Sequence, residues 1–172
     1  RPSSMYELMY SFCSFFLRKI DQKIFDNIPE AQYIQGNIYY DGKYIERDIN
    51  KSIHYLSLAA NLNHPIAQFN LGNIYYECKY IERDINKSIY YYSLAANQNH
   101  PNAQFMLGYI YYEGKYIERD INKSFHYLSL AANQNDPNAQ NKLGYIYYEG
   151  KYIERDINKS IYYYSLAANQ NH

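Results

Sequence analysis

The residues of this 172-residue chain that could bind a metal or catalyse a reaction are five histidines, two cysteines and a recurring Glu-Arg-Asp triplet. A metal site needs several ligands close together, and nucleophilic catalysis needs a nucleophile beside an oriented base. The histidines are instead spread along the chain, too far apart to share an ion, and the cysteines form no C-x-x-C pair. We therefore expect no catalytic, metal-binding or cofactor-binding residue. The histidines and cysteines are His54, His64, His100, His126, His172, Cys13 and Cys78.

The loop histidines and the triplets are better explained as ordinary loop residues than as parts of a site. His64, His100 and His172 occupy the same position in a repeated loop, and we interpret them as solvated loop histidines. The triplets, such as Glu46-Arg47-Asp48, are expected to form ion pairs within the loop and to cap the following helix.

A repeat of 36 residues organises the chain. The segment KYIERDINKS begins at Lys43, Lys79, Lys115 and Lys151. A fixed period of this length is typical of stacked helical units, in which no single unit buries its own apolar face. We predict an N-terminal helical cap at residues 1–30 and a repeat array at residues 31–172, with units at 31–66, 67–102, 103–138 and 139–172.

Each unit is predicted to be a hairpin of two antiparallel helices. In the second copy, Ala67, Leu71 and Ile74 recur at helical spacing and form one apolar stripe. A glycine ends the first helix in three copies, an aspartate caps the second helix, and small residues let the two helices approach closely. The predicted structural residues are Gly36, Gly72, Gly108, Gly144, Gly42, Gly114, Gly150, Asp48, Asp84, Asp120 and Asp156.

The repeated pattern, A-x-x-x-L-G-x-x-Y followed by Gly, D-x-x-K-[AS] and A-A, resembles the Sel1-like repeat family, which is related to the tetratricopeptide repeat. The match in the third copy comprises Ala103, Leu107, Gly108, Tyr111, Gly114, Asp120, Lys123, Ser124, Ala131 and Ala132. Departures are mild, such as Cys78 in place of Gly. The resemblance implies an all-α fold, an α/α solenoid or superhelix, that serves as a non-catalytic adaptor for protein complexes.

Protein binding is expected where the copies differ, which is mainly in the first helix of each unit. First helices generally line the concave face of such superhelices, where another protein or an extended peptide would bind. Four repeated glutamines, one position from the core stripe, are predicted to hydrogen-bond such a peptide. The candidate binding residues are Gln32, Gln68, Gln104, Gln140, Asn37, Asn73, Tyr109, Tyr145, Phe69 and Phe105.

Charge argues against two other classes of partner. Basic and acidic residues balance at 17 each, so the chain lacks the basic excess that phosphate binding requires. Helical-repeat RNA binding is therefore a weaker hypothesis, and a membrane-surface role is not expected. Few cysteines and no visible signal peptide favour the cytoplasm, whereas sequons such as Asn50-Lys51-Ser52 keep the endoplasmic reticulum lumen as the alternative.

The first residues carry a second resemblance. Arg1-Pro2-Ser3-Ser4, followed by Glu7-Leu8, is similar to a stretch near the end of a protein kinase catalytic domain, where the last helix begins. This resemblance implies that the chain is the C-terminal substrate-recruiting or regulatory region of a kinase whose catalytic domain lies upstream. The alternative is a helix cap with its preceding turn. In either case we expect the chain itself not to be an enzyme.

Overall fold

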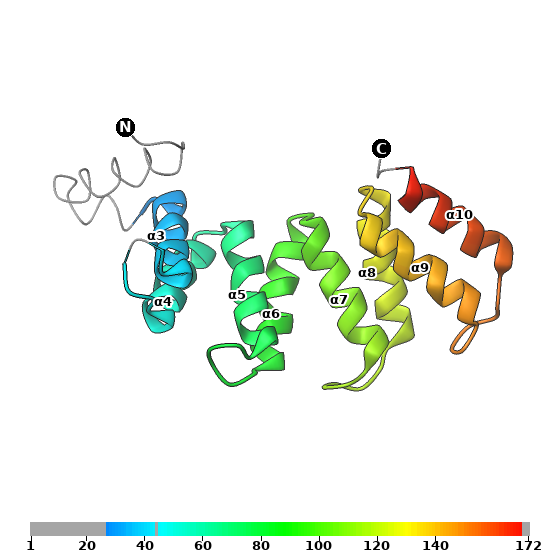
Figure 1. Cartoon of the computed structure of the whole chain (residues 1–172), viewed down its shortest axis with the longest axis horizontal. Helices are drawn as coiled ribbons and strands as arrows, with labels where there is room; N and C mark the ends of the chain where they lie inside the picture. The colour runs from blue at the N-terminus through cyan, green and yellow to red at the C-terminus, as the bar shows by residue number, and fades with distance from the viewer. Residues whose placement is uncertain (1–26, 44, 170–172) are drawn as a thin grey trace. The chain divides into compact units, whose positions relative to one another are not determined.

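The structure, a computed structural model, describes residues 27–43 and 45–169. Within these ranges every regular element is an α-helix, and the helices alternate in pairs that follow the 36-residue period (Figure 1). The predicted all-α solenoid of repeated hairpins is confirmed. The predicted cap lies almost wholly outside the described residues, as does the kinase-like stretch, so the division into cap and array stays a prediction.

The chain forms two compact units, residues 1–64 and 65–172. We call the two helices of each hairpin its first and second helix. The described hairpin of the first unit consists of α3 (Pro29–Asp41) and α4 (Ile49–Asn61). The second unit has three hairpins: α5 (Pro65–Glu77) with α6 (Ile85–Asn97), α7 (Pro101–Glu113) with α8 (Ile121–Asn133), and α9 (Pro137–Glu149) with α10 (Ile157–Ala168).

An aspartate determines where each second helix begins. The Oδ1 atom of Asp84 accepts a hydrogen bond of 3.0 Å from the backbone amide of Lys87, and the Lys87 ammonium lies 3.3 Å from the same carboxylate. The backbone hydrogen bond is the main reason that the pKa of Asp84 is lowered. The same cap occurs at Asp48, Asp120 and Asp156. Each cap satisfies an amide that has no partner within the helix.

A residue in the left-handed conformation ends each described first helix. At Gly114 the backbone φ angle is 59°, and a Cβ atom there would lie 2.7 Å from the Cβ atom of Arg119. In the second copy Cys78 adopts a φ angle of 49° at the equivalent position. Glycine reaches this conformation without steric cost, whereas other residues do not. The turn after α5 is therefore the strained one of the set.

The arginine of the Glu-Arg-Asp triplet binds the end of the preceding helix. Arg119 donates from Nε to the carbonyl oxygen of Tyr112 at 2.8 Å and from Nη2 to that of Glu113 at 2.9 Å. Arg47 and Arg83 make the corresponding bond to Tyr40 and Tyr76. The expected ion pair of the triplet is made by its aspartate, as between Asp84 and Lys87, whereas the guanidinium groups satisfy carbonyls that a helix end leaves without partners.

Glycine in the middle of each first helix lets the two helices of a hairpin touch. A Cβ atom at Gly72 would lie 2.5 Å from the ring of Tyr92, and one at Gly108 would lie 2.6 Å from Leu128. The close approach also allows a hydrogen bond between the two helices: Ser88 donates a 2.9 Å hydrogen bond to the carbonyl oxygen of Gly72. Tyr92 and Leu128 are fully buried as a result.

The apolar core of the second unit runs between successive hairpins. Tyr92, Ala95 and Ala96 of α6 pack with Ala103 and Leu107 of α7. The same positions one unit later, in α8 and α9, form the next part of the core. No helix in the described ranges is both long and apolar enough to cross a membrane.

Candidate functional site

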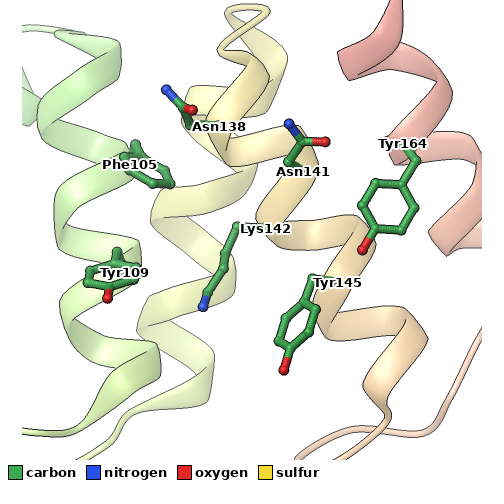
Figure 2. A pocket seen from close by; sticks show the side chains of 7 residues that line it. All are labelled: Phe105, Tyr109, Asn138, Asn141, Lys142, Tyr145 and Tyr164. Atoms are coloured by element: carbon green, nitrogen blue, oxygen red, sulfur yellow. The ribbon is translucent and has the colours of Figure 1, made fainter.

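A groove of about 470 Å³ opens on the first helices of the last two hairpins. Figure 2 shows its walls: two aromatic side chains from α7, four side chains from α9 and one tyrosine from α10. The residues that line it are Phe105, Tyr109, Asn138, Asn141, Lys142, Tyr145 and Tyr164. The groove thus joins aromatic rings to two side-chain amides and contains one charged group.

Lys142 lies among three tyrosine rings. Its Nζ atom is 4.2 Å from the ring centre of Tyr112, 5.1 Å from that of Tyr109 and 5.4 Å from that of Tyr145. The same atom forms an ion pair of 2.9 Å with Oε1 of Glu113. An ammonium group over aromatic faces is attracted by their electron density. With only 16% of its side chain exposed, Lys142 is held in place, and Glu113 balances its charge.

A second hollow of about 280 Å³ lies beside the groove and shares Lys142 and Tyr145 with it. Two of the residues that line it are joined, because the hydroxyl group of Tyr112 donates a 2.8 Å hydrogen bond to Glu149. Burial and this hydrogen bond raise the pKa of Tyr112, and the hydrogen bond lowers the pKa of Glu149. The tyrosine therefore stays protonated and the glutamate ionised at neutral pH. Neither group is therefore poised to exchange a proton at neutral pH.

The structure brings three of the predicted binding residues into the groove: Phe105, Tyr109 and Tyr145. Two others have internal partners, because Phe69 stacks on His100 with ring centres 4.8 Å apart and Asn73 accepts a 2.6 Å hydrogen bond from Tyr92.

Asn37 is half-buried in α3 of the first unit and is not one of the residues that line the groove.

The four repeated glutamines are not available to a peptide, which corrects the prediction made for them. Gln32, Gln68, Gln104 and Gln140 are at most 1% exposed. Gln104 donates to the carbonyl oxygen of Ala96 at 3.2 Å and accepts a 2.7 Å hydrogen bond from Gln134. A buried amide without partners would cost free energy, and the side chains of Gln68, Gln104 and Gln140 hydrogen-bond between and within hairpins. In the sequence each glutamine lies one position from the apolar stripe of its helix, and in the structure that position is also buried in the core.

The loop histidines are also corrected, since they are packed rather than solvated. Nδ1 of His100 accepts the backbone amide of Ala103 at 3.3 Å and so caps α7, and burial lowers the pKa of its imidazole. His64 stacks on Tyr33 with ring centres 4.7 Å apart and lies 2.9 Å from the carboxylate of Glu30. His172 lies outside the described residues. Among those described, no cluster of three or more His, Cys, Asp or Glu side chains could hold a metal ion.

Four groove residues were not among the candidate binding residues. Asn141 and Lys142 lie in the first helix, where variation between copies was expected to mark the site, whereas Asn138 and Tyr164 were missed altogether. Their signal was the same one that pointed to the first helices: both occupy positions at which the copies differ. Asn138 stands where the first two copies have Glu30 and Ile66, and Tyr164 stands where the third has Leu128. Asn138 is close to the start of its helix and Tyr164 is on a second helix, so neither belonged to the stretch where variation was sought.

The comparison with known families agrees with the repeated hairpins. The family model of the Sel1 repeat matches four times, at residues 29–64, 65–100, 101–136 and 137–172. The chain belongs to the Sel1 repeat family. Each match begins at the first residue of a first helix, two residues before the alanine with which we began each unit. Sel1 repeats are usually involved in protein–protein interaction and are generally non-catalytic. A search of curated proteins finds no match.

Solved structures of Sel1 repeat proteins are similar to this chain. A protective antigen of uropathogenic Escherichia coli with an SLR fold is 29% identical, with a TM-score of 0.81 over 88% of this chain and 32% of that one. A Sel1 repeat protein from Oxalobacter formigenes is 31% identical, with a TM-score of 0.79 over 84% and 42%. Cysteine rich protein B of Helicobacter pylori is 27% identical, with a TM-score of 0.56 over 76% and 94%. The chain spans less than half the length of the first two.

Proposed function

We propose that this chain is a non-catalytic scaffold of the Sel1 repeat family that binds another protein in the groove between α7 and α9. The proposal rests on the positions that the groove residues occupy within the repeat. All seven occupy positions at which the four copies are not identical, for example Tyr33, Phe69, Phe105 and Asn141. The capping aspartates and the mid-helix glycines, which build each hairpin, are the same in every copy. The groove is thus specific to this pair of hairpins.

The chemistry of the groove suits an extended peptide. The amides of Asn138 and Asn141 are exposed and can hydrogen-bond to a peptide main chain, which carries both donors and acceptors. The rings of Phe105, Tyr109 and Tyr145 provide apolar walls for one or two side chains of the ligand. Because Glu113 neutralises Lys142, the groove places little demand on the charge of that peptide.

The test is to change the groove without changing the hairpins. Asn141→Ala and Tyr145→Ala remove one amide and one ring from exposed positions. Tyr162→Ala is the matched control, because Tyr162 is an exposed tyrosine that does not line the groove. Affinity capture with a photo-crosslinking residue at position 138 should recover the same partner from the parent chain and the control, and much less from the two groove variants. Equal recovery by all chains, at equal melting temperature, would count against the groove.

Two other hypotheses, the C-terminal region of a kinase and an RNA-binding module, have separate tests. Reading the transcript in frame upstream of Arg1 tests the resemblance to the end of a kinase domain, since a catalytic loop there would make this chain the C-terminal region of a kinase. A titration with RNA at low and high salt tests nucleic-acid binding, for which the balanced charge predicts no salt-dependent complex.

A further inference from the structure

The hollow beside the groove has more positive than negative charge. The charged residues that line it are Arg119, Lys142, Lys151, Glu113 and Glu149. Both carboxylates have partners within the chain. Glu113 forms its 2.9 Å ion pair with Lys142, and Glu149 accepts the 2.8 Å hydrogen bond of Tyr112. Because three cations face two carboxylates, one positive charge is in excess.

Arg119 and Lys151 are the cations of the hollow that have no acidic partner. Within the described residues neither lies at ion-pair distance from a carboxylate. Arg119 is held by the two carbonyl oxygens at the end of α7 and lies 4.3 Å from the ring centre of Tyr152. Lys151 lies 5.1 Å from the same ring centre, and both cations are exposed. The ring attracts the two cations without neutralising their charge.

The equivalent hollow one hairpin earlier lacks this excess. It has a volume of about 100 Å³ and lies between α5 and α7, and the charged residues that line it are Glu113 and Lys115, one of each sign. Met106 stands there in place of Lys142. Because the hairpin of α9 and α10 follows it, a hollow at this position is an internal feature of the array. The later hollow differs in its larger volume and its charge.

The groove and the hollow follow one another along α7 and α9. On α7 the groove extends to Tyr109, and the hollow begins at Tyr112. On α9 the groove extends from Asn138 to Tyr145, which both share, and the hollow continues to Glu149. Figure 2 shows Tyr145 at the end of the groove that is nearer to the loop. A helix rises about 1.5 Å per residue and an extended peptide about 3.3 Å, so a peptide along α9 passes from one to the other within about two to four residues.

We propose that the peptide bound in the groove carries one acidic side chain, Asp or Glu, which binds in the hollow against Arg119 and Lys151. This inference rests on the proposed function, because the same peptide must lie in the groove. A carboxylate supplies the single negative charge that balances the hollow. Arg119 has further N–H donors beside the two that bind the carbonyl oxygens of α7, and a hydrogen bond from a guanidinium group to a carboxylate is a strong one. A phosphate group would bring more charge than the hollow balances.

The first experiment selects binders of the full chain from a phage-displayed library of short random peptides. The C-terminus of each peptide is joined to the phage protein, so the acidic group can come only from a side chain. The parent chain should enrich peptides that have Asp or Glu about two to four residues from an aromatic or aliphatic residue. Lys151→Gln should keep the preference for the apolar residue and lose the preference for the acidic one. Lys115→Gln, the same change one repeat earlier, is the matched control and should keep both.

The second experiment measures the dissociation constant of one enriched peptide by fluorescence anisotropy. Changing its acidic residue to the corresponding amide should weaken binding to the parent chain about fivefold, as expected for a partly exposed ion pair. The same change should have little effect on binding to Lys151→Gln. In Lys151→Glu the hollow has an excess of negative charge, so a lysine at that position of the peptide should be preferred. The preference of the parent chain for the acidic peptide should decrease as salt is added.

The outcomes separate this inference from the proposed function. Peptides that bind the parent chain without an acidic preference overturn the inference alone, and so does a preference that Lys151→Gln leaves unchanged. Asn141 lines the groove but not the hollow, so Asn141→Ala should weaken the acidic peptide and its amide form equally. If Asn141→Ala binds both forms as tightly as the parent chain does, or if the parent chain enriches no peptide, the groove itself fails and the inference falls with it.

Discussion

The hydroxyl group of Tyr112 in α7 donates a hydrogen bond of 2.8 Å to Glu149 in α9, and so connects the ends of two successive first helices. Tyr112 is 6% exposed and its ring meets that of Tyr152 edge to face, with ring centres 5.7 Å apart. Arg119 lies over the Tyr152 ring at 4.3 Å. The contact between these two hairpins therefore has a polar part at its loop end, in addition to the apolar core between α8 and α9.

Tyr112→Phe removes this hydrogen bond while keeping the ring. We expect the free energy of unfolding to fall by about 1 kcal/mol, the usual value of one intramolecular hydrogen bond. The pKa of Glu149 should rise toward that of a free glutamate, because the Tyr112 hydroxyl is the main cause of its lowering. Urea unfolding measures the first change, and an NMR titration of the carboxyl carbon measures the second. Tyr148→Phe, at a tyrosine that is 55% exposed, should change neither.

Gly72→Ala should destabilise the chain more than Gly144→Ala. A Cβ atom at Gly72 would lie 2.5 Å from the ring of Tyr92, which is fully buried and cannot move away. Overpacking of this kind costs about 1–3 kcal/mol. At Gly144 the nearest atom, on Tyr164, would lie 3.0 Å away, and that tyrosine is partly exposed and free to shift. The measurement is the decrease in melting temperature of each variant relative to the parent chain. Equal decreases would show that the ring of Tyr92 adapts as easily as that of Tyr164.

Cys78→Gly should stabilise the chain by about 1 kcal/mol, the cost of holding a non-glycine residue in the left-handed conformation less the entropy that glycine adds to the unfolded state. The contact that is lost is weak, a 3.4 Å approach of Arg83 to the sulfur atom. Thermal unfolding under reducing conditions is the measurement. Gly114→Ala, at the equivalent turn, is the reverse change and should lower stability. A melting temperature that does not rise for Cys78→Gly would mean that the cysteine compensates through its side chain.

The fold could be predicted from the sequence because the same residue pattern occurs four times along the chain. Four copies of one pattern give the period, and the turn residues have a local physical reason: a backbone amide to cap at Asp84, or a left-handed φ angle at Gly114. Such reasons depend on residues close in the chain. These local reasons therefore do not depend on how the rest of the chain folds.

The site was only partly predictable, because burial depends on contacts between hairpins. The pattern places Gln104 next to the apolar stripe but cannot say that Gln134, thirty residues away, donates to it. Lys142 occupies a position at which the copies differ, but its ion pair with Glu113 and its position over Tyr112 arise only when α7 and α9 lie together. The groove itself is a property of two adjacent hairpins, and a single copy of the repeat does not contain it.

His100 makes the stability of the chain depend on pH near neutrality. Its ring accepts the amide of Ala103, which requires a neutral nitrogen, and burial lowers the pKa of the folded imidazole below the ordinary value of about 6.5. The unfolded chain then binds the proton more readily, so this contribution is complete above about pH 6.5 and is lost as the pH falls below it. In the fourth copy Asp136 occupies the same position and accepts the amide of Ala139 at 2.7 Å.

His100→Asp should therefore keep the cap and move the loss of stability to the acidic range in which a carboxylate is protonated. Urea unfolding of the parent chain and of the variant, at intervals between about pH 8 and pH 5, gives the difference that belongs to this residue, since the other histidines are common to both chains. The difference should shift in favour of the variant as the pH falls through about 6.5. A constant difference over that range would show that His100 keeps the same proton affinity in the folded and unfolded chains.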